Sequence, residues 1–457
     1  MTHPDLTSTL AYTHQNHDRF LQELKDLCSI PSISTSPDHK DDMQRTAEWL
    51  AAKLHSIGMT DARVIPTPGN PVVYAERKST RNDVPTILVY GHYDVQPPEP
   101  LELWSSQPFE PEQRGENLYA RGASDMKGQV MASIDAVDTV LQNGALPCHI
   151  KFIIEGEEEI GSPHLRDFLV ANRDLLACDM ALNPDAGMVG PNTPSIVYAL
   201  RGLSYFELRV YGPKHDLHSG SYGGVVHNPA QALCELIAGM HDSNGTVTLP
   251  GFYDRVRPLD AEERAELARL PLSADHFQQE TGVSELWGES QFTPIERVGA
   301  RPTLEVNGLY SGYTGKGSKT VLPAWAMAKI SMRLVADQDP AEVHQQLLRY
   351  LEEHAPKTIH WEVTPMSGGA PCITDRNTRG TQALVKALET VWGSRPVFKR
   401  EGGSIPVVGD MQKILNADSV VTGFGLPDDN IHAPNEKLHL PTWFKGIDAL
   451  VHFFYYL

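Results

Sequence analysis

Imidazole and carboxylate side chains recur along this chain, each time close behind a short apolar segment or in a polar loop. The segments that carry them are GHYDVQP, RGASDMKGQ, IIEGEEEIGS, ALNPDAG and GFGLPDDNIHAPNEK. The side chains they present are His92, Asp94, Asp125, Glu158, Glu159, Asp185 and His432. Oxygen and imidazole nitrogen suit Zn²⁺, Mn²⁺ or Co²⁺, and a site without sulfur is typical of catalysis rather than structure. The pattern predicts a catalytic metal centre.

Each segment also has a simpler explanation when it is taken alone. His92 and Asp94 lie two apart in an extended segment, so they face the same side and could form a hydrogen-bonded surface pair. Asp125 precedes a predicted helix and could be its N-cap, while a lone histidine such as His432 is more often structural. The acidic run at 157–159 could be a solvated face. That run directly follows an apolar strand, however, and adjacent carboxylates allow one to bind a metal while its neighbour acts as a base.

The apolar pattern supplies the strands that would bring these residues together. Short β-branched and apolar runs predict strands at 71–77, 86–90, 149–155 and 179–183. Helical patterns with an apolar residue every three or four positions lie at 20–27, 46–58, 129–141 and 381–393. Alternating strands and helices imply an α/β sheet, and ligands in such sheets gather at the carboxyl ends of the strands.

The pattern changes near Ser195, where apolar and polar residues begin to alternate. Further strands are predicted at 196–212, 320–336 and 358–366, helices at 228–240 and 341–355, and a polar stretch at about 260–296. A chain of 457 residues exceeds what one hydrophobic core usually serves. We therefore expect a discontinuous first domain over 1–194 and 368–457, and an α+β domain inserted at 195–367.

Composition excludes several classes of function. Lys+Arg 39 against Asp+Glu 58 gives a net charge of −19, and the chain has no basic run of the kind that nucleic-acid binding needs. Five scattered cysteines without CxxC spacing argue against a disulfide framework and against a thiolate zinc site. The N-terminus lacks a basic and apolar leader, and we see no stretch of membrane-spanning length. We expect a cytoplasmic protein without a membrane or nucleic-acid partner.

Six ordered motifs resemble those of the M20 family of di-zinc metallopeptidases, in its branch of cytosolic nonspecific and carnosine dipeptidases. They are GHYDVQP, GASDMKGQ, GEEEIGSP, DLHSGSYGG, REGGSIP and DDNIHAPNE. The resemblance implies a zinc-peptidase-like α/β catalytic domain, with a mixed sheet flanked by helices, and an inserted lid and dimerisation domain. It also implies a homodimer that hydrolyses dipeptides with a free C-terminal carboxylate, using two Zn²⁺ ions or, alternatively, Mn²⁺ or Co²⁺.

The same resemblance assigns the metal ligands. His92 and Asp185 would hold one ion, Glu159 and His432 the other, and Asp125 would bridge both. It also implies a cis peptide bond after Asp125. Two divalent ions would lower the pKa of a water between them.

The resemblance assigns catalytic roles as well. Asp94 would support the histidine two residues before it. Counting back from IGS places Glu158 in the slot of the general base, which would take a proton from the water, and leaves Glu157 in a variable position. His218 of DLHSG would stabilise the oxyanion, from its own subunit or across a dimer, although a capping or core histidine is the simpler explanation.

Substrate contacts are implied in the same way. Arg333 and Thr320 would bind the substrate's terminal carboxylate, and Gly403 and Ser404 would line the pocket. Without the resemblance, Arg333 is an ordinary solvated arginine. The alternatives left open are an N-acyl amino acid deacylase, a carboxypeptidase of the same architecture, and a metal-binding homologue without activity.

Overall fold

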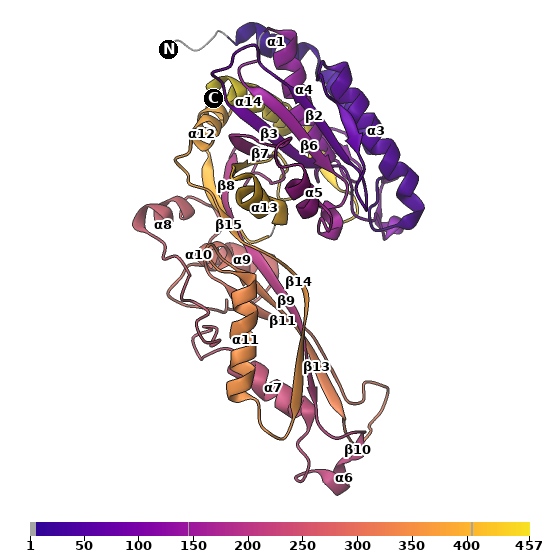
Figure 1. Cartoon of the computed structure of the whole chain (residues 1–457), viewed down its shortest axis with the longest axis vertical. Helices are drawn as coiled ribbons and strands as arrows, with labels where there is room; N and C mark the ends of the chain where they lie inside the picture. The colour runs from indigo at the N-terminus through magenta and orange to yellow at the C-terminus, as the bar shows by residue number, and fades with distance from the viewer. Residues whose placement is uncertain (1–5, 145, 404) are drawn as a thin grey trace. The chain divides into compact units, whose positions relative to one another are not determined.

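The computed structural model describes residues 6–144, 146–403 and 405–457 (Figure 1). The chain divides into two compact units. The first comprises Met1–Tyr198, Thr374–Lys399 and Val407–Leu457, and the second comprises Ala199–Ile373 and Arg400–Pro406. The short segment Arg400–Pro406, which is the REGGSIP motif, clusters with the second unit, whereas the sequence pattern had placed it in the first.

A mixed sheet forms the centre of the first unit, in the order β1-β2-β6-β3-β7-β17-β8. The strands β3, β6, β7 and β17 run parallel, while β1, β2 and β8 are antiparallel to their neighbours. Their bounds are β1 Arg63–Ile65, β2 Val72–Arg77, β3 Thr86–His92, β6 His149–Glu155, β7 Met180–Asn183, β17 Asp418–Val421 and β8 Ser195–Leu200. A further strand of this sheet, β16 Val397–Glu401, pairs with β8. A separate small sheet contains β4 Glu112–Arg114, β5 Asn117–Tyr119 and β18 Lys437–His439. The predicted α/β class is confirmed.

Helices surround this sheet. They are α1 Thr7–Gln15, α2 His17–Cys28, α3 Lys40–Ser56, α4 Lys127–Gln142, α5 Leu165–Ala171, α12 Arg379–Trp392, α13 Pro406–Leu415 and α14 Leu440–Tyr456. The most enclosed is α4, which is buried from Lys127 to Val140 and packs against α1, α2, α14 and strand β3. The helix α3 packs on β1 and β2. Helix α3 ends at Ser56, and Gly58 follows two residues later with a φ of 100°, which suits a residue without a side chain.

The second unit is built on an antiparallel sheet in the order β11-β13-β9-β14. Its strands are β9 Gly202–Tyr211, β11 Thr303–Ser311, β13 Trp325–Leu334 and β14 His360–Gly369. The short strands β10 Leu217–His218 and β12 Val321–Leu322 form a separate pair, and β15 Cys372–Ile373 pairs with β8. Helices α7 Pro229–Gly239 and α11 Pro340–His354 pack on this sheet. Alternate residues of β9 and β13 are buried and form an apolar core with the two helices.

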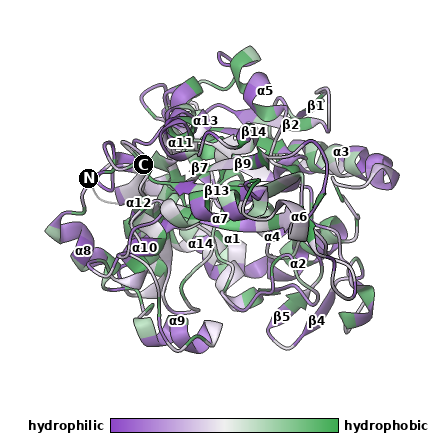
Figure 2. Ribbon diagram, turned by 90° about the horizontal axis from the view of Figure 1, so that it is seen from below, coloured by the Kyte–Doolittle hydropathy of each residue, from purple (hydrophilic) through white to green (hydrophobic). Residues whose placement is uncertain are grey.

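The stretch at 260–296, predicted only as polar, contains three short helices. They are α8 Ala261–Leu267, α9 Ala274–Thr281 and α10 Pro294–Ala300; a fourth short helix, α6 Ser219–Tyr222, lies earlier in this unit. The hydrophilic positions of α8 are visible in Figure 2. Asp260, Ser273 and Thr293 cap the three helices by accepting a backbone N–H. Within the described ranges, no helix has the length and apolar character required to cross a membrane.

Candidate metal centre

Three of the predicted metal ligands lie at or just after the carboxyl ends of parallel strands. His92 is the last residue of β3, and β6 and β7 run parallel to that strand on either side. Asp185 follows the end of β7 by two residues, and Glu159 follows the end of β6 by four. Because parallel strands end at one edge of a sheet, these three side chains come from the same edge.

Asp125 lies between the two histidines. One carboxylate oxygen, Oδ1, lies 3.2 Å from His92 Nε2, and the other, Oδ2, lies 2.9 Å from His432 Nε2. The residue that precedes α4 is Met126, and this helix has no side-chain cap. The N-cap explanation for Asp125 is therefore wrong, and the carboxylate is turned toward the histidines instead. The peptide bond that follows Asp125 is cis, as the resemblance implied.

Each histidine is accompanied by a second carboxylate. Asp185 Oδ1 lies 3.9 Å from His92 Nε2, and Glu159 Oε2 lies 3.2 Å from His432 Nε2. The structure thus brings the five predicted ligands into two groups that share Asp125. In each group the three candidate ligand atoms lie within 4.8 Å of one another, close enough to hold one metal ion.

The charges of this cluster also fit a pair of cations. Among the residues that the structure describes, no lysine or arginine forms an ion pair with Asp125, Asp185 or Glu159. Burial raises the pKa of Asp185 well above its ordinary value, and the charges of Asp125 and Glu158 add to the rise although His92 opposes it. One imidazole and two carboxylates per group suit Zn²⁺, Mn²⁺ or Co²⁺, so the donor set fits two divalent ions.

Asp94 connects His92 to the acidic turn. Both side chains are fully buried, so they are not the surface pair that HxD alone allowed. The His92 Nδ1–H donates to the backbone carbonyl of Asp94 at 3.0 Å, which leaves Nε2 facing Asp125. The Asp94 carboxylate accepts the backbone N–H groups of Glu158 at 3.2 Å and Glu159 at 3.0 Å. Asp94 therefore orients the histidine through its main chain and the turn through its side chain.

Glu155, the last residue of β6, and Glu157 of the acidic run are held by partners away from the metal ligands. Glu155 Oε1 accepts the Tyr90 hydroxyl at 2.8 Å and the Ser162 hydroxyl at 2.9 Å. Glu157 accepts the Asn70 backbone N–H at 3.0 Å through Oε1, and its Oε2 lies 2.8 Å from a ring nitrogen of His164. These contacts show that neither side chain forms the solvated face which acidic runs usually form.

The next two glutamates begin the short 3₁₀ helix Glu158–Ile160. Glu159 accepts the side-chain amide of Gln96 at 2.7 Å while its carboxylate faces His432. Glu158 is in neither of the two candidate ligand groups formed by the described residues. Burial raises the pKa of Glu158 to about 7, with Asp125 adding to the rise and His92 opposing it. Of the two adjacent carboxylates, only Glu159 belongs to a candidate ligand group, and the register counted from IGS stays a prediction.

The remaining predicted residues belong to the second unit. The exposed His218 caps α6, because its Nδ1 accepts the Gly220 backbone N–H at 3.0 Å. This is the simple role considered for it. Thr320 is also exposed, and its backbone carbonyl accepts the Ser219 N–H at 3.0 Å, next to the paired strands β10 and β12. The structure therefore places His218 and Thr320 side by side.

Sequence reasoning missed one arginine of the second unit, Arg201, which interacts with the predicted Arg333. Arg201 is partly buried between β8 and β9, and its Nε donates to the Gly402 carbonyl at 2.9 Å. Burial, together with the charge of Arg333, lowers the pKa of Arg201 to about 10. Two guanidinium groups thus lie near the REGGSIP motif, where Gly403 is exposed. The predicted Ser404 lies outside the described residues. Arg201 lies within the segment ALRGL, which resembles an ordinary strand end.

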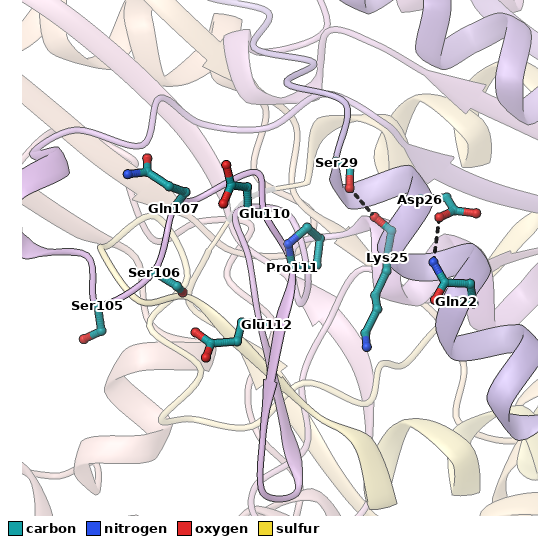
Figure 3. A pocket seen from close by; sticks show the side chains of 10 residues that line it. All are labelled: Gln22, Lys25, Asp26, Ser29, Ser105, Ser106, Gln107, Glu110, Pro111 and Glu112. Atoms are coloured by element: carbon teal, nitrogen blue, oxygen red, sulfur yellow. Dashed lines mark hydrogen bonds between the residues drawn. The ribbon is translucent and has the colours of Figure 1, made fainter.

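A pocket elsewhere in the first unit offers no comparable chemistry. It has a volume of about 590 Å³ and lies between α2 and the loop before β4 (Figure 3). Several of its polar side chains are satisfied locally, since Gln22 donates to Asp26 and Ser29 donates to the backbone of Lys25. None of the predicted site residues lines it.

Comparisons with known proteins agree with this geometry. A sequence model of peptidase family M20/M25/M40 matches residues 88–456. The Beta-Ala-His dipeptidase of Homo sapiens is 31% identical, over 98% of this chain and 92% of that protein. The structure of an M20 family metallo-carboxypeptidase from Sulfolobus solfataricus is 34% identical, with a TM-score of 0.83 over 95% of this chain and 98% of that one.

The solved di-peptidase Dug1p from Saccharomyces cerevisiae is 27% identical, with a TM-score of 0.78 over 99% of this chain and 98% of that chain. These matches cover both units and all six motifs. The family match includes most of the chain, and two of these relatives are more than 30% identical at nearly full length. The chain belongs to peptidase family M20/M25/M40.

Proposed function

We propose that this chain is a metal-dependent dipeptidase, which cleaves the peptide bond of dipeptides that have a free C-terminal carboxylate. The observation that carries the proposal is the pair of ligand groups joined by Asp125, each with one histidine and two carboxylates. The full-length similarity to a Beta-Ala-His dipeptidase and to the di-peptidase Dug1p supports this substrate class over N-acyl amino acids. A homologue without activity would lack a ligand or the base, and this chain has both.

The proposed roles follow from the positions of the side chains. When bound, two divalent ions, with Zn²⁺ the first expectation, supply Lewis acidity to the scissile carbonyl and to the attacking water. Glu158 takes the proton from that water and later passes it to the leaving amine. Asp94 holds Glu158 in place through the two backbone N–H groups of the turn. His218 donates a hydrogen bond to the oxyanion through Nε2, because Nδ1 is already used as a cap.

Substrate recognition is assigned to the second unit. Arg333, Gly403 and Ser404 would bind the terminal carboxylate and line the pocket. Thr320 lies beyond the opposite end of β13 from Arg333, so it would reach the same carboxylate from the other subunit of a dimer. We add Arg201, because two nearby guanidinium groups repel one another and an anion between them relieves that repulsion. A free carboxylate also matches the planar geometry of a guanidinium.

A homodimer formed through the second unit is the proposed assembly. The edge strand β11 exposes Leu309 and Tyr310, whose relative exposures are 58% and 48%. Exposed apolar side chains on an edge strand favour pairing with another copy. If His218 acts across the dimer, mixing inactive His218→Ala and Glu158→Ala subunits should restore part of the activity; an active monomer in sedimentation would exclude this arrangement.

A cytoplasmic location is also proposed, because the five cysteines are free thiols.

A substrate screen with a metal-depleted control tests the proposed function. The protein is stripped with a chelator, and Zn²⁺, Mn²⁺ or Co²⁺ is restored separately. Dipeptides, tripeptides and N-acetyl amino acids are then supplied at equal concentrations. We expect dipeptide hydrolysis only after metal is restored. Faster release of C-terminal residues from tripeptides would favour a carboxypeptidase, the activity named for the Sulfolobus relative, and hydrolysis by the stripped protein would refute the metal mechanism.

A further inference from the structure

Two carboxylates flank His432 in the DDNIHAPNE motif and have no role in the mechanism above. Asp429 and Glu436 are 1% and 0% exposed, so both are buried in the first unit. The loop between them has a left-handed backbone at Asn430, His432 and Asn435, with φ of 54°, 60° and 61°. Asparagine tolerates this conformation, but a histidine adopts it less readily, so the conformation of His432 depends on what holds the loop. The contacts of the two carboxylates show what holds the loop.

Glu436 binds the loop that carries Asp125. Its Oε1 accepts the backbone N–H of Ser124 at 3.0 Å and of Asp125 at 3.1 Å. Its Oε2 accepts the Gly122 backbone N–H at 2.9 Å and the Arg121 Nη1 at 2.7 Å. All four donors come from residues 121–125, just before Met126, the N-cap of α4. One buried carboxylate therefore ties the end of the His432 loop to the loop of the bridging ligand.

Asp429 makes the matching contact at the start of the His432 loop. Its Oδ2 accepts the Ser124 hydroxyl at 2.8 Å and the Leu426 backbone N–H at 2.7 Å, while Oδ1 accepts Lys437 Nζ at 3.0 Å. Ser124 is thus bound by both carboxylates, through its hydroxyl to Asp429 and through its backbone to Glu436. The two loops are joined at both ends of the segment that contains His432.

We propose that Asp429 and Glu436 are positioning residues, which fix His432 relative to Asp125 and so set the affinity of the ion held by Asp125, Glu159 and His432. The His432 side chain is 52% exposed, so packing does not fix its imidazole and the backbone of its loop must do so. The separation that the two carboxylates maintain is the 2.9 Å between Asp125 Oδ2 and His432 Nε2. The inference rests on the proposed function only in taking this group as the site of one ion.

The test is a metal titration of the Glu436→Gln variant. Glutamine has the same shape, but its NH₂ group replaces one acceptor oxygen and leaves two of the four donors facing another donor. Outer partners of metal ligands usually contribute about 10–100-fold in metal affinity. Metal-free protein is equilibrated with buffered Zn²⁺, and bound metal is counted by mass spectrometry. We call the ion beside His92 and Asp185 the first ion and the ion beside Glu159 and His432 the second ion. We expect wild-type affinity for the first ion and about 10–100-fold weaker affinity for the second ion.

Two further variants make the result decisive. Ser124→Ala removes only the hydroxyl that reaches Asp429, so it reports on the same contacts if Glu436→Gln fails to fold. Asp138→Asn is the matched control, because Asp138 is a 2% exposed carboxylate of the same unit that pairs with Arg19 at 2.7 Å. We expect Ser124→Ala to bind the second ion with lower affinity than wild type, and Asp138→Asn to bind both ions with wild-type affinity.

The proposal is overturned if folded Ser124→Ala and Glu436→Gln bind the second ion with wild-type affinity, or if both ions weaken equally. Equal weakening in Asp138→Asn would also overturn it, because general destabilisation would then explain the loss. These readouts need no substrate. Wild-type protein that binds two ions without cleaving dipeptides would contradict the proposed function and leave this inference standing.

Discussion

Replacing Glu158 with glutamine separates catalysis from metal binding. The substitution keeps the volume of the side chain, and the hydrogen bonds to Asp94 use backbone N–H groups of 158 and 159, which remain. The ligand cluster should therefore stay intact, and only proton transfer is lost. General-base catalysis contributes about 10²–10⁴-fold, which corresponds to about 3–5 kcal/mol of barrier. We expect kcat to fall by that factor.

The assay combines steady-state hydrolysis of a dipeptide with measurement of bound metal. Glu157→Gln is the matched control, because Glu157 is buried and bonded to Asn70 and His164 rather than facing the cluster. It should lower the free energy of unfolding by about 1–3 kcal/mol and leave kcat unchanged. A loss of less than about tenfold in Glu158→Gln, or a larger loss of kcat in the control, would refute the assigned register.

Three other predictions concern different parts of the molecule. Asp125→Asn should weaken both ions and Asp185→Asn only the first, as counted by metal analysis; equal effects would contradict the bridging role. Arg201→Met should raise KM for dipeptides about 10–100-fold with little change in kcat, and an unchanged KM would remove Arg201 from the carboxylate site. Burial raises the pKa of Asp135 well above its usual range; Lys53 and Arg19 oppose the rise, and Glu23 and Asp138 add to it. Folding therefore favours the protonated form of Asp135. The contribution of the protonated Asp135 to the free energy of unfolding is full below the unfolded-state pKa of about 4, and it is lost as the pH rises toward the pKa of Asp135 in the folded protein. Relative to wild type, Asp135→Asn should therefore gain up to about 1.4 kcal/mol per pH unit across that window in denaturant unfolding, and a constant difference would contradict this.

The ends of the strands could be predicted because the signal is local. The strands predicted at 86–90, 149–155 and 179–183 end within two residues of the ends of β3, β6 and β7. Helices α4, α7, α11 and α12 were likewise found from their apolar period. The five candidate ligands follow from these ends together with the motifs, and the structure brings them together.

Other elements had no usable local signal. Helix α14 is apolar on nearly every side and buried along most of its length, so it lacks the period that marks a surface helix. Helices α8 to α10 do begin at the N-cap residues Asp260, Ser273 and Thr293, but the charge of the stretch obscured them.

The contacts of Glu436 could not be read from the sequence at all. Its partners at 121–125 are about three hundred positions away, and only the fold brings the two loops together. Arg201 is similar, because its place beside Arg333 depends on the pairing of β9 with β13. Burial and long-range pairing, rather than residue type, decide the role of such side chains.

Anomalous X-ray diffraction from crystals grown with Zn²⁺ tests the central claim most directly. The measurement locates each ion independently of any assay. We predict two anomalous peaks per chain, one beside His92 and Asp185 and the other beside Glu159 and His432, with Asp125 in contact with both ions. A single peak, or ions bound by other residues, would contradict the account.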